Sequence, residues 1–391
     1  MNFSAVELDD EQRAFWKETR AFFEEHVGEE VHEEERRTGG GFNAGVHQAL
    51  GSRGWITPRW PVAEGGAGLD AIRARIVELE FERTGAPMIV SQTTPLPAIA
   101  VRMFANEELK NHVLSGVPDG TINICLGYTE PDCGSDLASA RTRAVRDGDE
   151  WVINGQKMFT SGAEFCQYSL VLTRTNPDAP KHKGLTVFLV PLDLPGIEIR
   201  PIRTVGGEST NFVHYDDVRV SDYYRIGGVD DGWSVLSAPL ADEHGMGEID
   251  DLQPGSGRVT INRARLLLDA VIQTLKNQVD EQGRPRLEDP VTRERLARMR
   301  LEIEISVMAP GPMARVDGAE MLVRSACDML ELMGPAGLLP TGTEGALGGG
   351  FPEYMYRFCP GTRIYGGTTD IHRNIIAEQI LGLPRSTPKS R

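Results

Sequence analysis

Cysteines are scarce in this sequence, and their spacing excludes two common kinds of site. Five occur among 391 residues, an odd number, and no pair has the C-x-x-C spacing of a zinc cage. Disulfide frameworks belong mainly to short secreted chains that are far richer in cysteine. We therefore expect neither a disulfide-stabilised fold nor a metal site. The cysteines are Cys125, Cys133, Cys166, Cys327 and Cys359.

Long apolar runs and excess positive charge are also missing. No stretch reaches the ~18 apolar residues of a membrane-spanning helix, and the acidic, amphipathic start is unlike a secretory signal. Lys and Arg number 41 against 57 Asp and Glu, a net charge of -16 that repels nucleic acids and anionic membranes. We expect a cytoplasmic protein that binds no nucleic acid. A phosphorylated ligand stays compatible, because a few local donors decide phosphate binding.

The chain changes character twice along its length. Residues 8–36 and 71–83 place apolar side chains at helical spacing among charged neighbours. From Thr121 the apolar runs become short, rich in β-branched and aromatic residues, and separated by turn residues, which is typical of strands. After Gly232 the helical period returns. The predicted domains are helical at 1–120, β at 121–231 and helical at 232–391.

Three segments resemble the motifs of one protein family. LGYTEPDCGSD at 126–136 is similar to a TEPxxGSD signature, and NGQKMFTSGA at 154–163 is similar to an NGxKxWITNG strand. RIYGGTTDIHRNIIAEQILGLPR at 363–385 resembles the carboxy-terminal segment of the same proteins. Because the order also matches, the chain resembles the acyl-CoA dehydrogenases over essentially its whole length. This resemblance implies an α+β multidomain fold with an N-terminal helical domain, a middle β-barrel-like domain and a C-terminal four-helix bundle.

The resemblance implies an FAD cofactor and residues that hold it. A flavin needs hydrogen bonds along its pyrimidine edge, a flat wall and a polar cradle for its pyrophosphate. In the family, the equivalents of Tyr128 and Thr129 lie along the isoalloxazine. Those of Gly134 and Ser135 lie at the pyrophosphate, and Ser135 is also expected to face the substrate. By itself TEPDCGSD is more typical of a solvated turn, but the ordered motifs favour the cofactor interpretation.

Four further residues complete the expected flavin site. Phe159 replaces the family's tryptophan over the ring, keeping a flat wall but losing an N–H donor. Ser161 is expected near the flavin N5 edge. Gly367 and Thr368 correspond to the carboxy-terminal Gly-Thr that meets the flavin and the thioester.

The catalytic base is not where many family members carry it. Those proteins read Tyr-Glu-Gly-Thr near the carboxyl end, whereas this chain has Gly366 in the position of the glutamate. A minority branch, which includes isovaleryl-CoA dehydrogenase, carries the base on the first long helix after the β-domain. Alignment with that helix makes Glu243 the expected base, which removes the α proton while the β carbon gives hydride to the flavin. The backbone N–H of Gly366 would then bond the thioester oxygen and stabilise the developing enolate.

Two alternatives to this assignment stay open. Glu243 is also compatible with an ordinary exposed glutamate, and Asp242 is a neighbouring candidate base. His244 stands where the family usually has arginine. It is expected at the substrate, where it either modulates the carboxylate pKa or is a polar surface residue.

The adenosine-binding arm of the family is altered. Val279 and Gln282 stand where the family's Arg and Phe bind the FAD of a neighbouring subunit, leaving Arg284 or Arg286 as partial replacements. A relocated base and a degenerate arm resemble one subunit of the α2β2 acyl-CoA dehydrogenases of steroid catabolism. Partners implied by the resemblance are therefore an acyl-CoA substrate, an electron-transfer flavoprotein, and either further copies of the chain or a homologous subunit.

Three functions are compatible with these features. The first is an FAD-dependent acyl-CoA dehydrogenase that forms the 2,3-enoyl-CoA, with a weak preference for steroidal or branched acyl groups. The second is a catalytically silent structural subunit of a heteromeric dehydrogenase. The third is a flavin oxidase or monooxygenase on the same fold.

Overall fold

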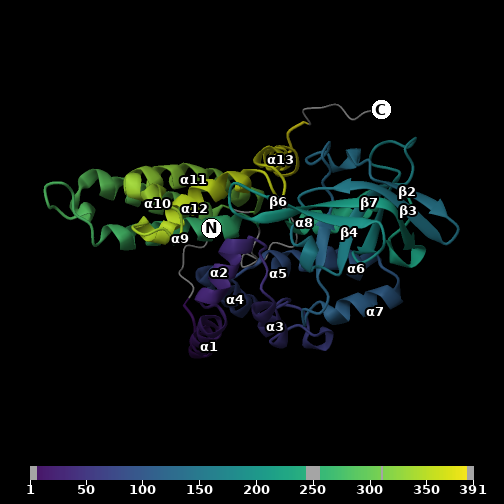
Figure 1. Ribbon diagram of the computed structural model, residues 1–391, viewed down its shortest axis with the longest axis horizontal. Helices are drawn as coiled ribbons and strands as arrows, with labels where there is room; N and C mark the ends of the chain where they lie inside the picture. Colours follow the sequence, from purple (N-terminus) through teal and green to yellow (C-terminus); the bar gives the residue numbers. More distant parts are fainter. Residues whose placement is uncertain (1–6, 244–255, 310, 385–391) are drawn as a thin grey trace. The chain divides into compact units, whose positions relative to one another are not determined.

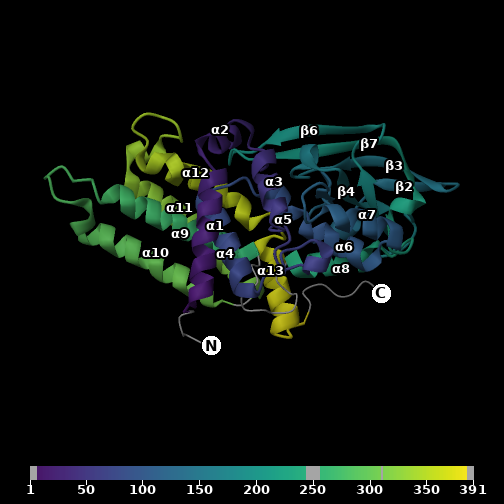
Figure 2. The same cartoon turned by 90° about the horizontal axis from the view of Figure 1, so that it is seen from below.

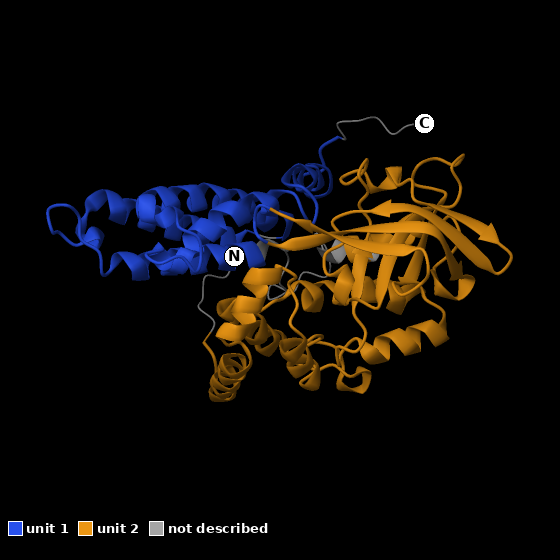
Figure 3. Cartoon of the chain, viewed as in Figure 1, with its two compact units in different colours: residues 1–5, 205–207, 243–391 blue, residues 6–204, 208–242 orange. Residues whose placement is uncertain are grey.

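The computed structural model describes residues 7–243, 256–309 and 311–384, without the side chains of residues 238, 241–243 and 256–258. The chain forms two compact units (Figure 3). The mixed unit contains residues 6–204 and 208–242, and the helical unit contains residues 1–5, 205–207 and 243–391. The boundaries predicted at 120 and 231 lie close to the first strand and to the start of α8. They stay predictions, because the compact units divide the chain differently.

Helices form the first part of the mixed unit, and their ends follow local capping chemistry. The Asp9 carboxylate accepts from the Gln12 N–H at 2.7 Å, and the Gln12 side-chain oxygen accepts from the Asp9 N–H. This reciprocal pair is a capping box. Gly85 ends α4 in a left-handed conformation that glycine adopts without strain. The helices are α1 (Asp10–His26), α2 (Glu29–Thr38), α3 (Ala44–Ser52), α4 (Ala71–Thr84), α5 (Ile89–Thr93), α6 (Pro95–Phe104), α7 (Glu107–Gly116) and, after the strands, α8 (Gly232–Glu243).

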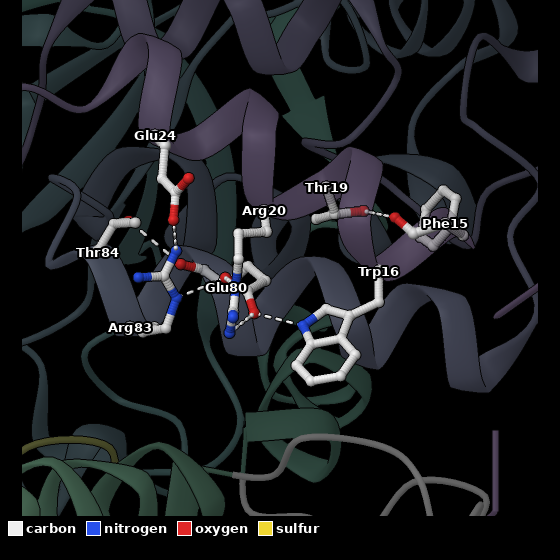
Figure 4. A network of polar contacts seen from close by, with 8 residues as sticks. All are labelled: Phe15, Trp16, Thr19, Arg20, Glu24, Glu80, Arg83 and Thr84. Atoms are coloured by element: carbon white, nitrogen blue, oxygen red, sulfur yellow. Dashed lines mark hydrogen bonds and ion pairs between the residues drawn. The ribbon is translucent and has the colours of Figure 1, made fainter. Parts of the chain in front are cut away.

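A buried carboxylate joins α1 to α4 (Figure 4). Glu80 of α4 accepts from the Trp16 indole at 2.5 Å and from Arg20 at 3.1 Å, both on α1. Arg83 donates to its other oxygen at 2.5 Å. Burial by itself would raise the pKa of Glu80, but these donors outweigh it and hold that pKa below the ordinary value. The carboxylate therefore stays ionised and fixes the two helices to each other.

The strands pair into one mixed sheet. In the described residues it has eight strands in the order β6-β7-β3-β2-β4-β5-β8, with β1 pairing with β4. The β2–β4 contact is a single parallel pair, Arg143 with Arg174, and β1 also runs parallel to β4, whereas all the other strand pairs are antiparallel. The strands are β1 (Ile124–Gly127), β2 (Arg143–Asp147), β3 (Glu150–Lys157), β4 (Tyr168–Arg174), β5 (Leu185–Pro191), β6 (Ile197–Arg203), β7 (Ser209–Ser221) and β8 (Arg225–Ile226).

Strand β4 is buried on both faces, which explains its continuous apolar sequence. Leu170 and Leu172 pack with α6 and α7, which cover this face of the sheet (Figure 1). Val171, pointing the opposite way, packs with Trp151 and Val213 in the core on the other face. The alternation follows from the two-residue period of a strand.

The helical unit is built on three long helices that lie side by side (Figures 1 and 2). Their apolar faces form one core that also takes in the helix before the carboxy-terminal motif. The family fold expected from the sequence is confirmed. None of the described helices is long and apolar enough to cross a membrane. The helices are α9 (Ser256–Leu275), α10 (Pro290–Met308), α11 (Gly311–Met333), α12 (Phe351–Phe358) and α13 (Thr369–Ile375).

Candidate functional site

The TEPDCGSD segment begins as a tight turn that leaves its glycine and serine exposed. The Glu130 N–H donates to the Cys133 carbonyl at 2.8 Å, and the Cys133 N–H returns a bond at 3.1 Å. Gly134 and Ser135 follow on the surface. Asp136 ends the turn, where the Lys181 ammonium, with help from the Ser139 hydroxyl, holds the carboxyl pKa below its ordinary value. The two residues expected at a pyrophosphate are therefore accessible on a fixed turn.

Tyr128 and Thr129, which precede this turn, have both of their carbonyls bonded inside the protein. The buried Tyr128 has its carbonyl bonded by the Lys157 ammonium at 3.2 Å, and the Thr129 carbonyl accepts the Met158 N–H at 2.9 Å. The Thr129 N–H and hydroxyl bond no residue that the structure describes. The pyrimidine edge of a flavin carries mainly acceptors, so the N–H and the hydroxyl of Thr129, both of which can donate, fit it.

Phe159 is an exposed aromatic residue held in a strained backbone conformation. Its φ is 57° and the residue is 55% exposed. A left-handed conformation costs about 1–2 kcal/mol for a residue with a Cβ. Next to it, Asn211 bonds both the N–H and the carbonyl of Thr160, at 3.0 and 3.1 Å. The neighbouring residues thus hold the strain, which is common where a side chain is presented to a ligand.

Ser161 lies on the same segment, directly after Thr160. Its hydroxyl shares a hydrogen bond with Thr210 at 2.9 Å, and the residue is partly buried. Since either hydroxyl can donate in this pair, Ser161 keeps the capacity to offer a proton to a ligand atom. The structure places Tyr128, Thr129, Phe159 and Ser161 on two segments that bond each other directly.

A buried ion pair beside these segments was missed by sequence reasoning. Lys157 bonds the Glu130 carboxylate at 2.7 Å, with both side chains buried. Burial by itself would raise the pKa of Glu130, but the Lys157 ammonium and two backbone N–H donors outweigh it and lower that pKa. A signal was present, because strand alternation puts Lys157 on the same face as Trp151 and Ile153. A lysine on an apolar face requires a carboxylate partner.

The carboxy-terminal motif forms a turn in the helical unit. Gly366 and Gly367 have φ values of 61° and 78°, which a side chain would strain. The buried Arg315 donates to the carbonyl of Tyr365, and His372 bonds the Gly366 carbonyl at 3.0 Å. Arg315 and His372 are thus further positioning residues that the sequence did not suggest.

Thr368 follows the two glycines as the N-cap of α13. Its hydroxyl accepts the Ile371 N–H at 3.2 Å. Its predicted contact with the flavin stays a prediction, because the helical and mixed units are each described by themselves. The same holds for Gly366 and Gly367.

The predicted base lies at the limit of the described chain. Glu243 is the last residue of α8, and the structure describes only its backbone. The side chain of Asp242 and the whole of His244 also lie outside the described residues. The role of Glu243 as the base and the place of His244 at the substrate therefore stay predictions, as does Asp242 as an alternative base. Among the described residues, no three His, Cys, Asp or Glu side chains gather where they could hold a metal ion.

The altered adenosine arm is a short turn in the helical unit. Val279 is exposed, and Arg284 is bonded within the turn by Asp280 at 2.8 Å. Arg286 donates to the Leu332 carbonyl at 2.7 Å. Both arginines proposed as replacements are therefore engaged inside their own unit.

Comparison with known proteins assigns the chain to a family. Family models describe the N-terminal, middle and C-terminal domains of acyl-CoA dehydrogenases, and they match residues 9–121, 125–218 and 307–381. Acyl-CoA dehydrogenase FadE26 of Mycobacterium tuberculosis is 31% identical over 359 residues, 86% of this chain and 87% of that protein. The chain belongs to the acyl-CoA dehydrogenase family. The resemblance stated from the motifs is confirmed.

This acyl-CoA dehydrogenase homologue is also similar to solved structures, one of which is titled a steroid ACAD. The Tcur3481-Tcur3483 steroid ACAD matches with a TM-score of 0.84 and 31% identity, covering 98% of this chain and all of that one. The ChsE4-ChsE5 complex of Mycobacterium tuberculosis matches with a TM-score of 0.84 and 27% identity, covering 98% and 100%. FAD is the cofactor of this family, and the cofactor prediction is confirmed. The family is one of flavoprotein oxidoreductases of lipid or steroid catabolism.

Proposed function

We propose that this protein uses FAD to oxidise an acyl-CoA thioester to the 2,3-enoyl-CoA, with Glu243 as the base. The observation that carries the proposal is the pair of bonded segments in the mixed unit. One offers the donors of Thr129, and the other presents the strained ring of Phe159. Bound FAD supplies the hydride acceptor for the reaction.

The roles proposed for this chain's own residues follow from that arrangement. Tyr128 and Thr129 bind the flavin edge, Phe159 covers the ring, Ser161 bonds near N5, and Gly134 and Ser135 bind the pyrophosphate. They orient the cofactor and exclude water from one of its faces.

Substrate activation is assigned to residues outside those two segments. Glu243 takes the α proton, while the Gly366 N–H donates to the thioester oxygen. Thr368 and Gly367 complete the site, with Ser135 and His244 facing the substrate. Two glycines in succession leave room for a bulky acyl group, which supports a steroidal or branched substrate class.

A heteromeric assembly is part of the proposal. The printed titles of the two solved structures each name two proteins, and the adenosine arm of this chain is altered. In addition, α10 exposes Leu301, Ile305 and Met308, which recur at spacings of four and three and therefore share one helix face. An exposed apolar stripe of this kind supports association with another subunit. An electron-transfer flavoprotein is the proposed acceptor, and the cytoplasmic location stays a prediction.

The decisive experiment replaces Glu243 by glutamine in flavin-loaded protein. Bleaching of the flavin absorbance by steroidal and straight-chain CoA thioesters is recorded, with Asp242→Asn as the matched control. We expect Glu243→Gln to slow bleaching about 100- to 10,000-fold with flavin content unchanged, and Asp242→Asn to have little effect.

Each alternative function gives a different result in that experiment. The reverse order of the two variants would make Asp242 the base. A heteromeric assembly that thioesters bleach equally well with either variant of this chain would support the silent structural subunit. Rapid reaction of the reduced flavin with oxygen would support an oxidase or monooxygenase.

A further inference from the structure

Glu130 and Lys157 form an ion pair at a place where charges are costly. Their side chains are 6% and 0% exposed, and the ammonium lies 2.7 Å from the carboxylate. Removing two charges from water costs several kcal/mol per ion, which the attraction between them only partly offsets. Stability alone is therefore a poor explanation for this pair.

The pair connects three separate segments of the mixed unit. The two Glu130 oxygens accept the N–H groups of Arg141 and Thr142 at 2.7 and 2.9 Å, just before β2. Lys157, the last residue of β3, bonds the Glu130 carboxylate and also the Tyr128 carbonyl at 3.2 Å. The Glu130 carboxylate and the Lys157 ammonium thus hold the three segments together, and a shift of one segment would break its hydrogen bonds to the others.

The backbone next to the pair continues the same register. The Met158 N–H donates to the Thr129 carbonyl at 2.9 Å. In both segments this bond lies one residue after the contact between Lys157 and the Tyr128 carbonyl. Two successive residues at the end of β3 thus bind two successive carbonyls. Phe159 follows immediately, with its left-handed φ of 57°. The offset between the Thr129 donors and the Phe159 ring is therefore set at the buried pair.

We propose that Glu130 and Lys157 are positioning residues that fix the Thr129 donors and the Phe159 ring at the mutual offset required by an isoalloxazine. Neither residue contacts the flavin itself, and the proposal rests on the flavin site described under the proposed function. The Tyr128 carbonyl and the Thr129 N–H belong to one trans peptide and point in opposite directions, so the lysine that holds the carbonyl also fixes the direction of the N–H. Loss of the pair would release this peptide and the register.

The test removes both charges together, because removal of one partner would leave a buried unpaired charge and destabilise the fold. The variant is Lys157→Met with Glu130→Gln. The matched control is Arg219→Met with Glu150→Gln, which removes an exposed pair at 2.8 Å in the same sheet. FAD dissociation constants and the visible circular dichroism of the flavin are measured on the assembly in which the wild-type chain carries flavin, well below its unfolding midpoint.

We expect the buried-pair variant to bind FAD about tenfold more weakly, with an altered flavin dichroism, and the control to behave as wild type. Native affinity and dichroism in the folded double variant would overturn the proposal and leave the pair a structural role. If the double variant does not fold, Glu130→Asp decides the matter, because it keeps the charge but shortens its reach. Weaker FAD binding at an unchanged unfolding midpoint supports the proposal, and unchanged binding refutes it.

Failure of the proposed function gives a different result. A wild-type chain that binds FAD but is bleached by no CoA thioester would contradict the dehydrogenase assignment. The FAD affinities of the variants would still test the positioning role.

Discussion

Substitution of Phe159 should change the stability of the fold and the affinity for FAD in different ways. Alanine and glycine both remove the ring, but only glycine adopts the φ of 57° without strain. Phe159→Gly should therefore be more stable than Phe159→Ala, although it removes more atoms. Both variants should bind FAD more weakly than wild type.

The magnitudes follow from the backbone and the exposure of the residue. The left-handed conformation costs about 1–2 kcal/mol for alanine, and glycine loses about 0.5–1 kcal/mol more backbone entropy on folding. The glycine variant should then be more stable than the alanine variant by about 0.5–1 kcal/mol. With 55% of the residue exposed, loss of the ring removes only about 1 kcal/mol of burial in either variant. A lost aromatic contact of about 0.5–1.5 kcal/mol weakens FAD binding roughly 2- to 12-fold.

Two measurements on wild type and the variants check this prediction. Urea denaturation gives the order of stability, and titration followed by flavin fluorescence gives the FAD affinities. Phe159→Trp is the control that keeps a flat ring and should retain the affinity. Equal urea midpoints for the glycine and alanine variants would refute the strain argument. Unchanged FAD affinity in both would refute the role of the ring as a wall.

Three further perturbations test the helices. Glu80→Gln should lower the free energy of unfolding by about 1–3 kcal/mol at pH 7. Because the folded pKa is lowered, the deficit should shrink as the pH falls below the ordinary value of 4.5, which urea titrations at several pH values would show. Thr368→Ala removes the α13 cap and should cost about 0.5–2 kcal/mol by the same assay, whereas Thr368→Ser should not. Ile305→Asp, on the exposed face of α10, should weaken subunit association in analytical ultracentrifugation and leave the secondary structure unchanged; an unchanged assembly would remove the stripe from the interface.

Local patterns in the sequence predicted most of the elements. Apolar spacing predicted the helix at 71–83, observed as Ala71–Thr84 with the Asp70 carboxylate as its cap. The short apolar runs predicted strands close to β4 and β5. The ends of the elements were less predictable than their type. Residues 8–36, for example, divide into α1 and α2 at Val27 and Gly28.

The candidate site was predicted only in part. Motif order singled out Phe159, but nothing in the local sequence indicated its left-handed backbone, which depends on Asn211 about 50 residues later. The partners of Lys157 were hidden for the same reason, although strand alternation already placed this lysine on a buried face.

The sequence by itself determined the family, the helix and strand periods, and the absence of a glutamate at Gly366, because these depend on residue type and order. Only the tertiary structure decided which groups pair in the interior. It showed the carboxylate of Glu130 against Lys157 and the carbonyl of Tyr365 against Arg315. A buried charge or carbonyl must find its partner wherever the fold brings one, and in a folded chain that partner is rarely a neighbour in sequence.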